Sequence, residues 1–439
     1  MVERSPPGRP HRAADGTAAG DTSREGATTA GQDRRTGNGP PGTQSQEGDE
    51  ALPNGASRGT SDPQTSSGTV HGRPFGRQAY AALDLGTNNC RLLIARPSGE
   101  NFTVIDAFSR VVRLGEGLAH SGKLSDAAMD RTLAALKVCA DKLRKRNVRL
   151  ARSVATEACR RASNGEAFIE RVLRETGIRL DIISAQEEAR LAVLGCHVLL
   201  EQGHGPALIF DIGGGSTELV LIEPGETVPR IVDWQSVPWG VVSLTDTVGA
   251  DDTSNETRAA RYAHMRRIVT TSFTQFAERI APTHRANRAD IRLLGTSGTV
   301  TTLASIYLDL KQYDRRKVDG LIMPSEGMRE VAQRLAGLSW DERSELPIIG
   351  RERAELVVAG CAILESILDI WPADRLGVAD RGIREGILRS LIASENDAEE
   401  SRRTLREQQR EQRAEQAETR FDRPAEQAEQ GSDRKRGER

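Results

Sequence analysis

The sequence predicts an α/β fold with mixed sheets, organised as two related domains. Apolar, strand-like runs alternate with helical patterns between residues 78 and 394, as in α/β proteins. Residues 79–95 and 208–222 also share one layout, in which an apolar strand is followed by Asp-x-Gly, small or polar residues and a second apolar strand. The shared aspartates, Asp84 and Asp211, are about 127 residues apart. This spacing indicates two related α/β domains rather than a solenoid.

The two ends of the chain differ in composition from this core. Residues 1–77 are mainly Gly, Ser, Thr, Pro, Arg and Asp, and we expect them to be disordered because they have little apolar surface to bury. They contain no apolar core of a secretory signal. Residues 395–439 are rich in Arg, Glu and Gln, which predicts disorder or a solvated helix. The predicted domains are therefore 78–200 and 201–394.

Composition excludes several classes of protein. The net charge of −2 selects neither a polyanionic nor a cationic partner. No apolar run reaches the ~18 residues that span a bilayer. The five cysteines form no CxxC pair and are typical of buried thiols in a reducing compartment. We therefore expect a cytoplasmic protein without a membrane partner.

The pattern of each segment predicts its secondary structure in order. Residues 125–146 have helical spacing with a polar N-cap and basic residues in the last turn. The remaining predictions before the second repeat are strands at 148–156 and 178–184 and a helix at 185–201. After the repeat we expect strands at 230–240 and 290–298, and helices at 255–280, 299–310 and 352–371.

The glycine-rich turn after Asp211 points to phosphate chemistry. Glycines let the backbone approach a ligand closely, and successive N–H groups form a nest for phosphate oxygens. A carboxylate beside a phosphate repels it unless a divalent cation lies between them. One such hairpin alone is equally well explained as a tight turn. Two copies, together with a third glycine-rich turn at 295–303, favour a phosphate–metal site in a cleft.

Two other phosphate motifs are not supported. Residues 117–124, GLAHSGKL, nearly fit GxxxxGK[ST], but Leu124 occupies the position of the Ser or Thr that binds magnesium, and no strand precedes the motif. No GxGxxG opens a helix after a strand, so a dinucleotide site of the Rossmann type is unsupported.

These motifs resemble those of the Ppx/GppA family of exopolyphosphatases and guanosine pentaphosphate phosphohydrolases. DLGTNNCRLLIA and DIGGGSTELV are similar to its two phosphate loops. VATEACRRASN, IISAQEEARL, GTSGTVTTLA and VADRGIREGIL are similar to its other blocks, over residues 80–393. The resemblance implies two actin-like (ribonuclease H-like) lobes with an active cleft between them. The chain resembles the short form, without the C-terminal HD-type domain of longer members.

The adjacent glutamates in ISAQEEARL have different predicted roles. Ser184 and Glu187 fit a capping box, in which each side chain bonds the backbone N–H of the other residue. Glu188 is about 100° further around the helix and has no such local role. The resemblance makes Glu188 the general base that takes a proton from the attacking water.

The resemblance assigns the other site residues. Glu218 orients the water or helps Asp84 and Asp211 to hold Mg²⁺, for which Mn²⁺ is a substitute. Arg160 matches an arginine that contacts phosphate, a task that suits its planar fork. The remaining phosphate-binding candidates are Asn88, Gly213, Gly214, Gly215, Ser216, Thr296, Ser297 and Gly298.

The function with the most support is hydrolysis of terminal phosphate from inorganic polyphosphate. Removal of the 5′ γ-phosphate of guanosine pentaphosphate (pppGpp) remains open, because both substrates end in a phosphoanhydride. A non-catalytic sensor of polyphosphate or a guanosine alarmone is a third hypothesis, although a sensor needs no water-activating base.

The basic run at 141–152 is either a solvated helix end or a track for a polyanion. It lacks interleaved aromatic residues, so we expect no nucleic-acid partner. The family resemblance implies a homodimer.

Overall fold

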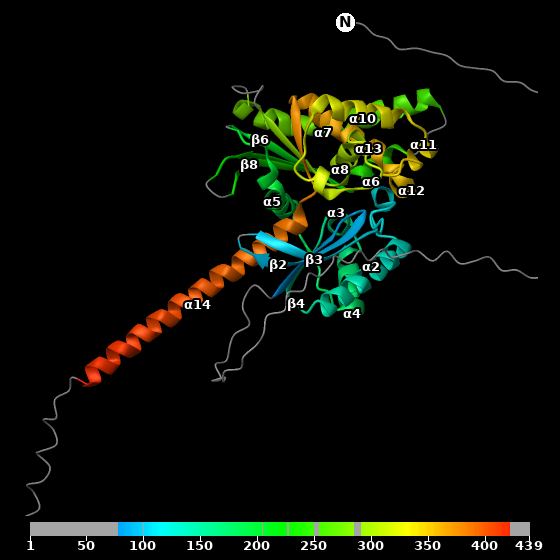
Figure 1. Ribbon diagram of the computed structural model, residues 1–439. Coiled ribbons are helices and arrows are strands. Elements are labelled where there is room, and N and C mark those ends of the chain that lie inside the picture. The colour runs from blue at the N-terminus through cyan, green and yellow to red at the C-terminus, as the bar shows by residue number, and fades with distance from the viewer. Residues whose placement is uncertain are drawn as a thin grey trace, which may run out of the picture. The chain divides into compact units, whose positions relative to one another are not determined.

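The computed structural model describes residues 78–99, 101–203, 205–225, 228–249, 254–284 and 291–421, and these contain two β-sheets (Figure 1). The predicted tail at 1–77 lies outside the described residues, as does the end of the C-terminal tail from residue 422. Among the described residues, no helix combines the length and apolar character needed to cross a membrane.

The first sheet has the strand order β3-β2-β1-β4-β5. Strands β1, β2 and β3 pair antiparallel, and β1, β4 and β5 pair parallel. The strands are β1 (Ala79–Leu85), β2 (Asn89–Ser98), β3 (Asn101–Val111), β4 (Val148–Ala155) and β5 (Asp181–Ile182). The strand predicted at 178–184 is therefore much shorter than expected.

The second sheet has the order β10-β11-β9-β6-β7-β8. The strands are β6 (Ala207–Ile212), β7 (Thr217–Glu223), β8 (Arg230–Val237), β9 (Arg292–Thr296), β10 (Ile322–Pro324) and β11 (Arg375–Ala379). Three antiparallel strands, β6 to β8, adjoin two parallel neighbours, β9 and β11. This repeats the plan of the first sheet and confirms the predicted class of two mixed-sheet lobes.

The helices before β6 mostly cover the first sheet. They are α1 (Leu118–Ser121), α2 (Asp126–Lys145), α3 (Glu157–Arg161), α4 (Gly165–Thr176) and α5 (Ala185–Cys196), followed by the 3₁₀ turn η2 (His197–Leu199). Helix α2 begins as predicted, with the Ser125 hydroxyl accepting from the Ala128 N–H at 3.2 Å. The helix predicted at 185–201 ends at Cys196 instead.

The later helices cover the second sheet, except for the last. They are α6 (Val241–Val248), α7 (Asn255–His284), α8 (Gly298–Tyr307), α9 (Arg315–Val318), α10 (Ser325–Gly337), α11 (Trp340–Ser344), α12 (Gly350–Arg353), α13 (Leu356–Ile370) and α14 (Ile383–Phe421). The helix predicted at 352–371 is divided into α12 and α13.

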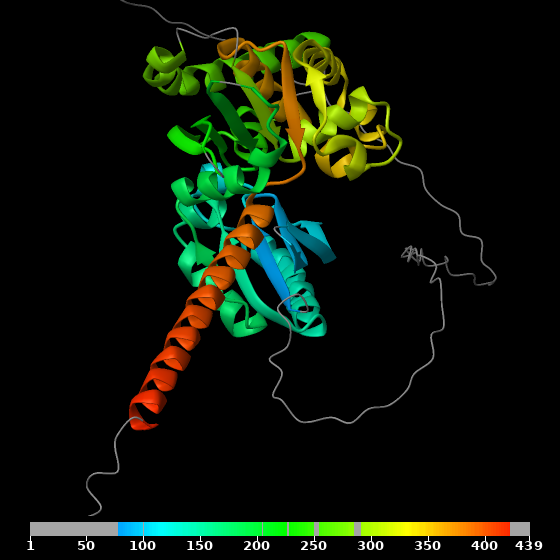
Figure 2. The same ribbon diagram turned by 60° about the vertical axis from the view of Figure 1, so that its left-hand side comes forward.

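Helices α5 and α14 lie between the two sheets (Figures 1 and 2). Ile387 and Leu388 of α14 pack with Tyr80 of the first sheet, whereas Ala189 of α5 packs with Ile209 of the second. The start of α14 therefore belongs with the first sheet, although the predicted boundary assigned residues up to 394 to the second domain. The exact division into domains stays a prediction.

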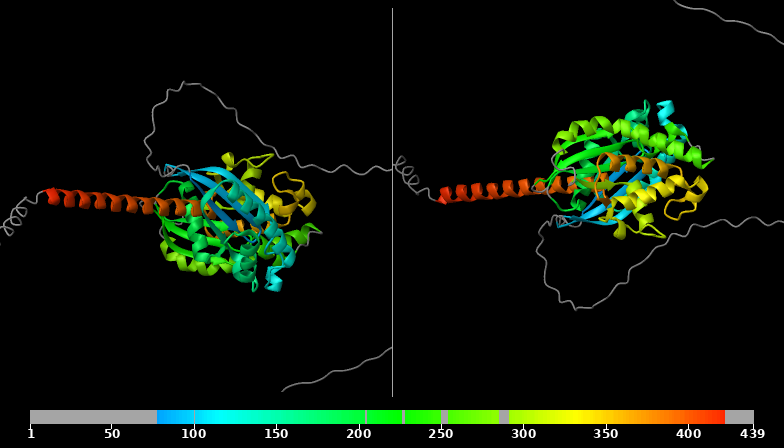
Figure 3. Two further views of the ribbon diagram at one scale, coloured as in Figure 1. Left: turned by 90° about the horizontal axis from the view of Figure 1, so that it is seen from below. Right: turned by 90° about the horizontal axis from the view of Figure 1, so that it is seen from above.

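Beyond residue 400 the side chains of α14 are exposed as far as they are described. Figure 3 shows this helix continuing past the neighbouring elements. Of the two alternatives for the C-terminal tail, the structure has a helix up to Phe421, with exposed side chains from residue 401 to 414.

Candidate active site

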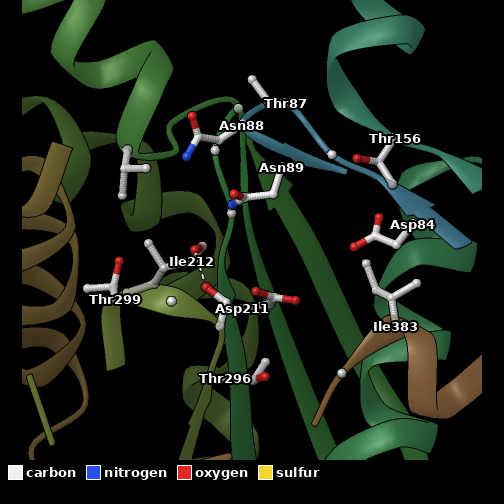
Figure 4. Close-up of a pocket in the computed structure, with 18 of the residues that line it drawn as sticks. Asp84, Thr87, Asn88, Asn89, Thr156, Asp211, Ile212, Thr296, Thr299 and Ile383 are labelled. Carbon is white, nitrogen blue, oxygen red and sulfur yellow. Dashed lines mark hydrogen bonds between the residues drawn. The ribbon is translucent and has the colours of Figure 1, made fainter. Parts of the chain in front are cut away.

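The strand period of two directs both repeated aspartates into the space between the sheets. Tyr80 and Ala82 of β1 face α14, so Asp84 shares their face. Ala207 and Ile209 of β6 face α5, so Asp211 shares theirs. Because α5 and α14 pair between the sheets, the two aspartates point into one region (Figure 4).

A pocket of about 150 Å³ occupies this region. Both Asp-x-Gly hairpins line it, together with the third glycine-rich turn and the loop after β11. Of the predicted site residues, those lining it are Asp84, Asn88, Glu188, Asp211, Gly213, Gly214, Gly215, Ser216, Glu218, Thr296, Ser297 and Gly298. Arg160 is the one predicted site residue that does not line it.

The turns of the two hairpins, residues 86–88 and 213–216, are called the first and second phosphate-type loops. They approach each other so closely that the second loop has no room for side chains at its glycines. A Cβ atom on Gly215 would lie 2.6 Å from the Thr87 hydroxyl, and one on Gly214 would lie 3.1 Å from the Asn88 nitrogen. Glycine is required here because the first loop occupies the space that a side chain would take. The backbone of the second loop is consequently bare toward the pocket.

The third turn holds a strained residue beside the start of α8. Ser297 has φ 82° and ψ −176°, a region that residues other than glycine rarely adopt. Its hydroxyl donates to the Ile212 carbonyl, which ties this turn to the second loop. Gly298 and Thr299, the first residues of α8, line the pocket, and the first N–H groups of a helix have no partner within the helix, as in phosphate sites.

Glu188 lies in the first turn of α5 and is 6% exposed. Its carboxylate accepts from Arg160 at 3.1 Å. Burial raises the pKa of Glu188 well above its usual value, and the charge of Glu218 raises it further, while Arg160 opposes both. A carboxylate with a raised pKa is a stronger base at neutral pH.

Of the two hydrogen bonds in the predicted capping box, the structure has one. The Ser184 hydroxyl accepts from the Glu187 N–H at 3.2 Å. The Glu187 carboxylate, however, pairs with Arg190 at 2.7 Å and Arg152 at 2.9 Å. Two arginines take the place of the backbone N–H, because both are charged and Arg190 binds the two carboxylate oxygens of Glu187 at once.

Glu218 is buried in the second hairpin, not outward-facing as in a plain surface strand. It is 2% exposed and accepts from the Ser216 hydroxyl at 2.6 Å and the Ser236 hydroxyl at 2.9 Å. Burial, with the charge of Asp211, raises its pKa to about 7. Burial also raises the pKa of Asp211 to about 6.

The half-buried Asp84 and Asn88 fit a divalent cation. The Asp84 Oδ1 and Asn88 Oδ1 atoms are buried without a hydrogen-bond partner, and burial raises the pKa of Asp84. Hard cations such as Mg²⁺ take such oxygen ligands. Among the described residues, no three His, Cys, Asp or Glu side chains form a ready metal cluster. Mg²⁺ needs none, since it usually binds one or two carboxylates plus water and phosphate.

In the structure, Arg160 binds two carboxylate groups. Its guanidinium bonds Glu188, Glu157 and the Ile183 carbonyl. Glu157 and Glu188 line the pocket, so Arg160 lies directly behind that wall. Its contact with phosphate stays a prediction.

Sequence reasoning missed the arginines that line the pocket. Arg91, Arg353, Arg381 and Arg384 line it, and Arg381 is paired with Asp319 at 2.8 Å. The alternating charges of VADRGIREGIL could have indicated Arg381 and Arg384. No local pattern marks Arg353, which comes from α12.

The basic run at 141–152 is largely neutralised by acidic partners. Lys142 and Arg146 both pair with Asp106, at 2.7 and 2.8 Å. Arg149 pairs with Glu395 at 3.0 Å. These ion pairs favour the solvated helix end over a track for a polyanion.

Bare backbone loops facing carboxylates and arginines across a two-lobed cleft define a class of enzymes that act on phosphate groups. The family model for the Ppx/GppA phosphatase family matches residues 93–395, and the chain belongs to this family. The predicted family is thereby confirmed, as is the class of phosphoanhydride hydrolase.

Individual relatives agree with this assignment. The chain is 31% identical to "Exopolyphosphatase 2" of Mycobacterium tuberculosis over 71% of this chain and 98% of that protein. The crystal structure of the Aquifex aeolicus member of the Ppx/GppA family is 28% identical, with a TM-score of 0.59 over 73% of this chain and 99% of that one. The fold is also that of an exopolyphosphatase from Cytophaga hutchinsonii, at 24% identity, with a TM-score of 0.62 over 72% of this chain and 98% of that one.

Proposed function

We propose that this protein is an exopolyphosphatase, which releases terminal phosphate from inorganic polyphosphate. The observation that carries the proposal is the position of Glu188, a buried carboxylate with a raised pKa in the wall of a pocket formed by two phosphate-type loops. The relative named exopolyphosphatase supports the choice of substrate.

In the proposed reaction, Glu188 takes a proton from a water molecule that attacks the terminal phosphorus. The new bond joins the water oxygen to phosphorus as the bridging P–O bond breaks, and the bridging oxygen leaves on the shortened chain. Arg160 keeps the Glu188 carboxylate oriented, and the backbone N–H groups of Gly213–Gly215 and Gly298 hold the phosphate oxygens. Positioning and charge stabilisation account for most of the rate in such reactions.

Asp84, Asp211 and Glu218 are the proposed carboxylates that hold a divalent cation, which we take to be Mg²⁺, with Mn²⁺ as a substitute. The three, which all lie in the described part of the chain, do not form a ready cluster, so part of the set would bind the cation through water, as Mg²⁺ usually does. When bound, the cation neutralises charge on the phosphate oxygens. The unpartnered Asp84 Oδ1 supports this assignment.

The proposal also includes a cytoplasmic homodimer without a nucleic-acid or membrane partner. The five cysteines are free thiols and all are buried, which is typical of proteins in reducing compartments. The dimer rests on the family alone.

The test is phosphate release by the full chain, offered long-chain polyphosphate or guanosine pentaphosphate in separate assays with Mg²⁺. Glu188→Gln should abolish release from polyphosphate. The matched control is Glu187→Gln, which alters the neighbouring glutamate on the same helix and should retain activity. Phosphate release from guanosine pentaphosphate alone would mean that the nucleotide, and not polyphosphate, is the substrate. Tight binding without release from either substrate would identify a sensor.

A further inference from the structure

Helix α6 is bonded to the second phosphate-type loop at its N-terminal end. The Val241 N–H donates to the Gly213 carbonyl at 3.0 Å, and the Ser243 hydroxyl donates to the Gly215 carbonyl at 2.9 Å. Gly240, just before the helix, contacts Gly214 so closely that a Cβ atom there would lie 2.4 Å from its carbonyl carbon. The position of the loop is therefore coupled to the position of α6.

The other end of α6 contacts a segment attached to the first sheet. The Gly117 N–H donates to the Asp246 carboxylate at 3.0 Å. The His120 Nε2 atom lies 3.0 Å from the Asp246 backbone oxygen. Residues 117–124 are the near-match to a P-loop in the sequence. In the structure they form a short helix between two glycines with positive φ instead.

Residues 112–115, which lead into this segment, are bonded to the first phosphate-type loop. The Val112 N–H donates to the Asn88 carbonyl at 2.8 Å, and the Gly115 N–H to the Thr87 carbonyl at 2.9 Å. Arg131 of α2 donates to the Val112 carbonyl at 3.1 Å. A series of hydrogen bonds thus joins the first loop, residues 112–117, Asp246, α6 and the second loop.

We propose that Asp246 is a positioning residue that holds the two phosphate-type loops at the separation the substrate requires. Asp246 does not line the pocket, so it acts through the loops. The proposal rests on the proposed hydrolysis, in which the phosphate held by the second loop lies opposite Asp84 and Asn88 of the first hairpin. A carboxylate that accepts from a backbone N–H forms a charge-assisted bond, and its loss loosens the spacing of the two loops.

The kinetic test compares Asp246→Ala with Asp246→Asn, which keeps an oxygen that accepts from Gly117. Asp246→Ala should raise the KM for polyphosphate about five- to tenfold, as expected for one hydrogen bond to a charged group, with kcat less affected. Asp246→Asn should stay within about twofold of the wild type, since an acceptor remains. Thr247→Ala is the matched control, because the Thr247 hydroxyl bonds back to the Ser243 carbonyl within α6. An unchanged KM in Asp246→Ala, with Asp246→Asn also unchanged, would overturn the proposal.

A second measurement does not depend on the substrate. Hydrogen exchange of peptides that contain Gly117 is followed by mass spectrometry in the three full-length proteins without ligand. The Gly117 amide should exchange faster in Asp246→Ala than in wild type or Asp246→Asn, with equal melting temperatures. Equal exchange in all three would exclude the contact. If the wild-type protein hydrolyses no polyphosphate, the proposed substrate fails, and the exchange result still decides whether Asp246 holds the segment.

Discussion

Asp211 and Glu218 are directly opposite each other in the antiparallel register of β6 and β7. Like charges at opposed positions destabilise a sheet. In the first hairpin, the corresponding pair is Asp84 and Arg91, which attract each other. The second hairpin therefore keeps an acidic pair that the fold does not need. Such a local conflict is typical of a functional site.

Hydrolysis should increase with pH between about 6 and 8, because Glu218 can hold a cation only in its deprotonated form. Burial raises the pKa of Glu218 to about 7, and that of Glu188 is raised for the same reason. The check is kcat/KM for polyphosphate from pH 5 to 9 at several Mg²⁺ concentrations. More Mg²⁺ should shift the rise to lower pH, since a cation stabilises the charged carboxylates. A flat profile would contradict this assignment.

Asp211→Asn should make the protein more stable at pH 8 while removing activity. The pKa of Asp211 is raised from 3.8 to about 6 by burial, so between these values the folded state binds more protons than the unfolded state. Stability therefore falls as pH rises through this window. Relief of this half-buried charge should add on the order of 1–2 kcal/mol to the free energy of unfolding.

Urea unfolding of both proteins at pH 5 and pH 8, without divalent cations, measures this difference. The gain from Asp211→Asn should be larger at pH 8. Mg²⁺ should stabilise the wild type more than the variant at that pH. A gain that is the same at both pH values would mean that ionisation of Asp211 is not responsible.

Gly195→Ala should impair both stability and catalysis, because α5 and α14 touch through their backbones. A Cβ atom at Gly195 would lie 2.0 Å from the Gly382 carbonyl oxygen. Relief of this overlap displaces α5, which carries Glu188. We expect a loss of about 1–3 kcal/mol in stability and a reduction in kcat on the order of 10²-fold.

The matched control is Gly337→Ala in α10, where an added Cβ meets nothing within 4 Å. That substitution should be neutral or slightly stabilising. Thermal unfolding and phosphate release check both variants. Wild-type kcat in Gly195→Ala would show that Glu188 tolerates movement of its helix.

Removal of residues 1–77 and 401–439 should leave kcat/KM within a few-fold of the full chain. The described side chains from residue 401 onward are exposed, and the first segment has little apolar surface to bury. Removal of everything from Ile383 is the contrasting case, since Ile387 and Leu388 are buried against the first sheet. That shorter chain should fail to fold, and a collapse of activity in the milder truncation would reveal a role for the tails.

Local patterns predicted most of the fold and the core of the site. The two hairpins, the Ser125 and Ser184 caps and the position of Asp84 and Asp211 at the strand ends follow from strand alternation, capping rules and glycine-rich turns. The roles of Glu188, Glu218 and Arg160 come instead from the family resemblance. The errors are local competitions that pattern rules do not settle. Glu187 turns to two arginines instead of closing its capping box, and the helix predicted at 352–371 is divided.

The sequence by itself determined that two Asp-x-Gly hairpins would present bare backbone and carboxylates, because glycine tolerance and strand period are properties of neighbouring residues. Tertiary structure alone decided which distant groups meet there. Arg353 enters the pocket from α12, Arg160 stands behind Glu188, and Asp246 connects α6 to Gly117. The Arg160–Glu188 contact joins residues 28 positions apart, and the Gly117–Asp246 contact joins residues 129 positions apart. Such contacts arise only when the chain packs both sheets around α5 and α14.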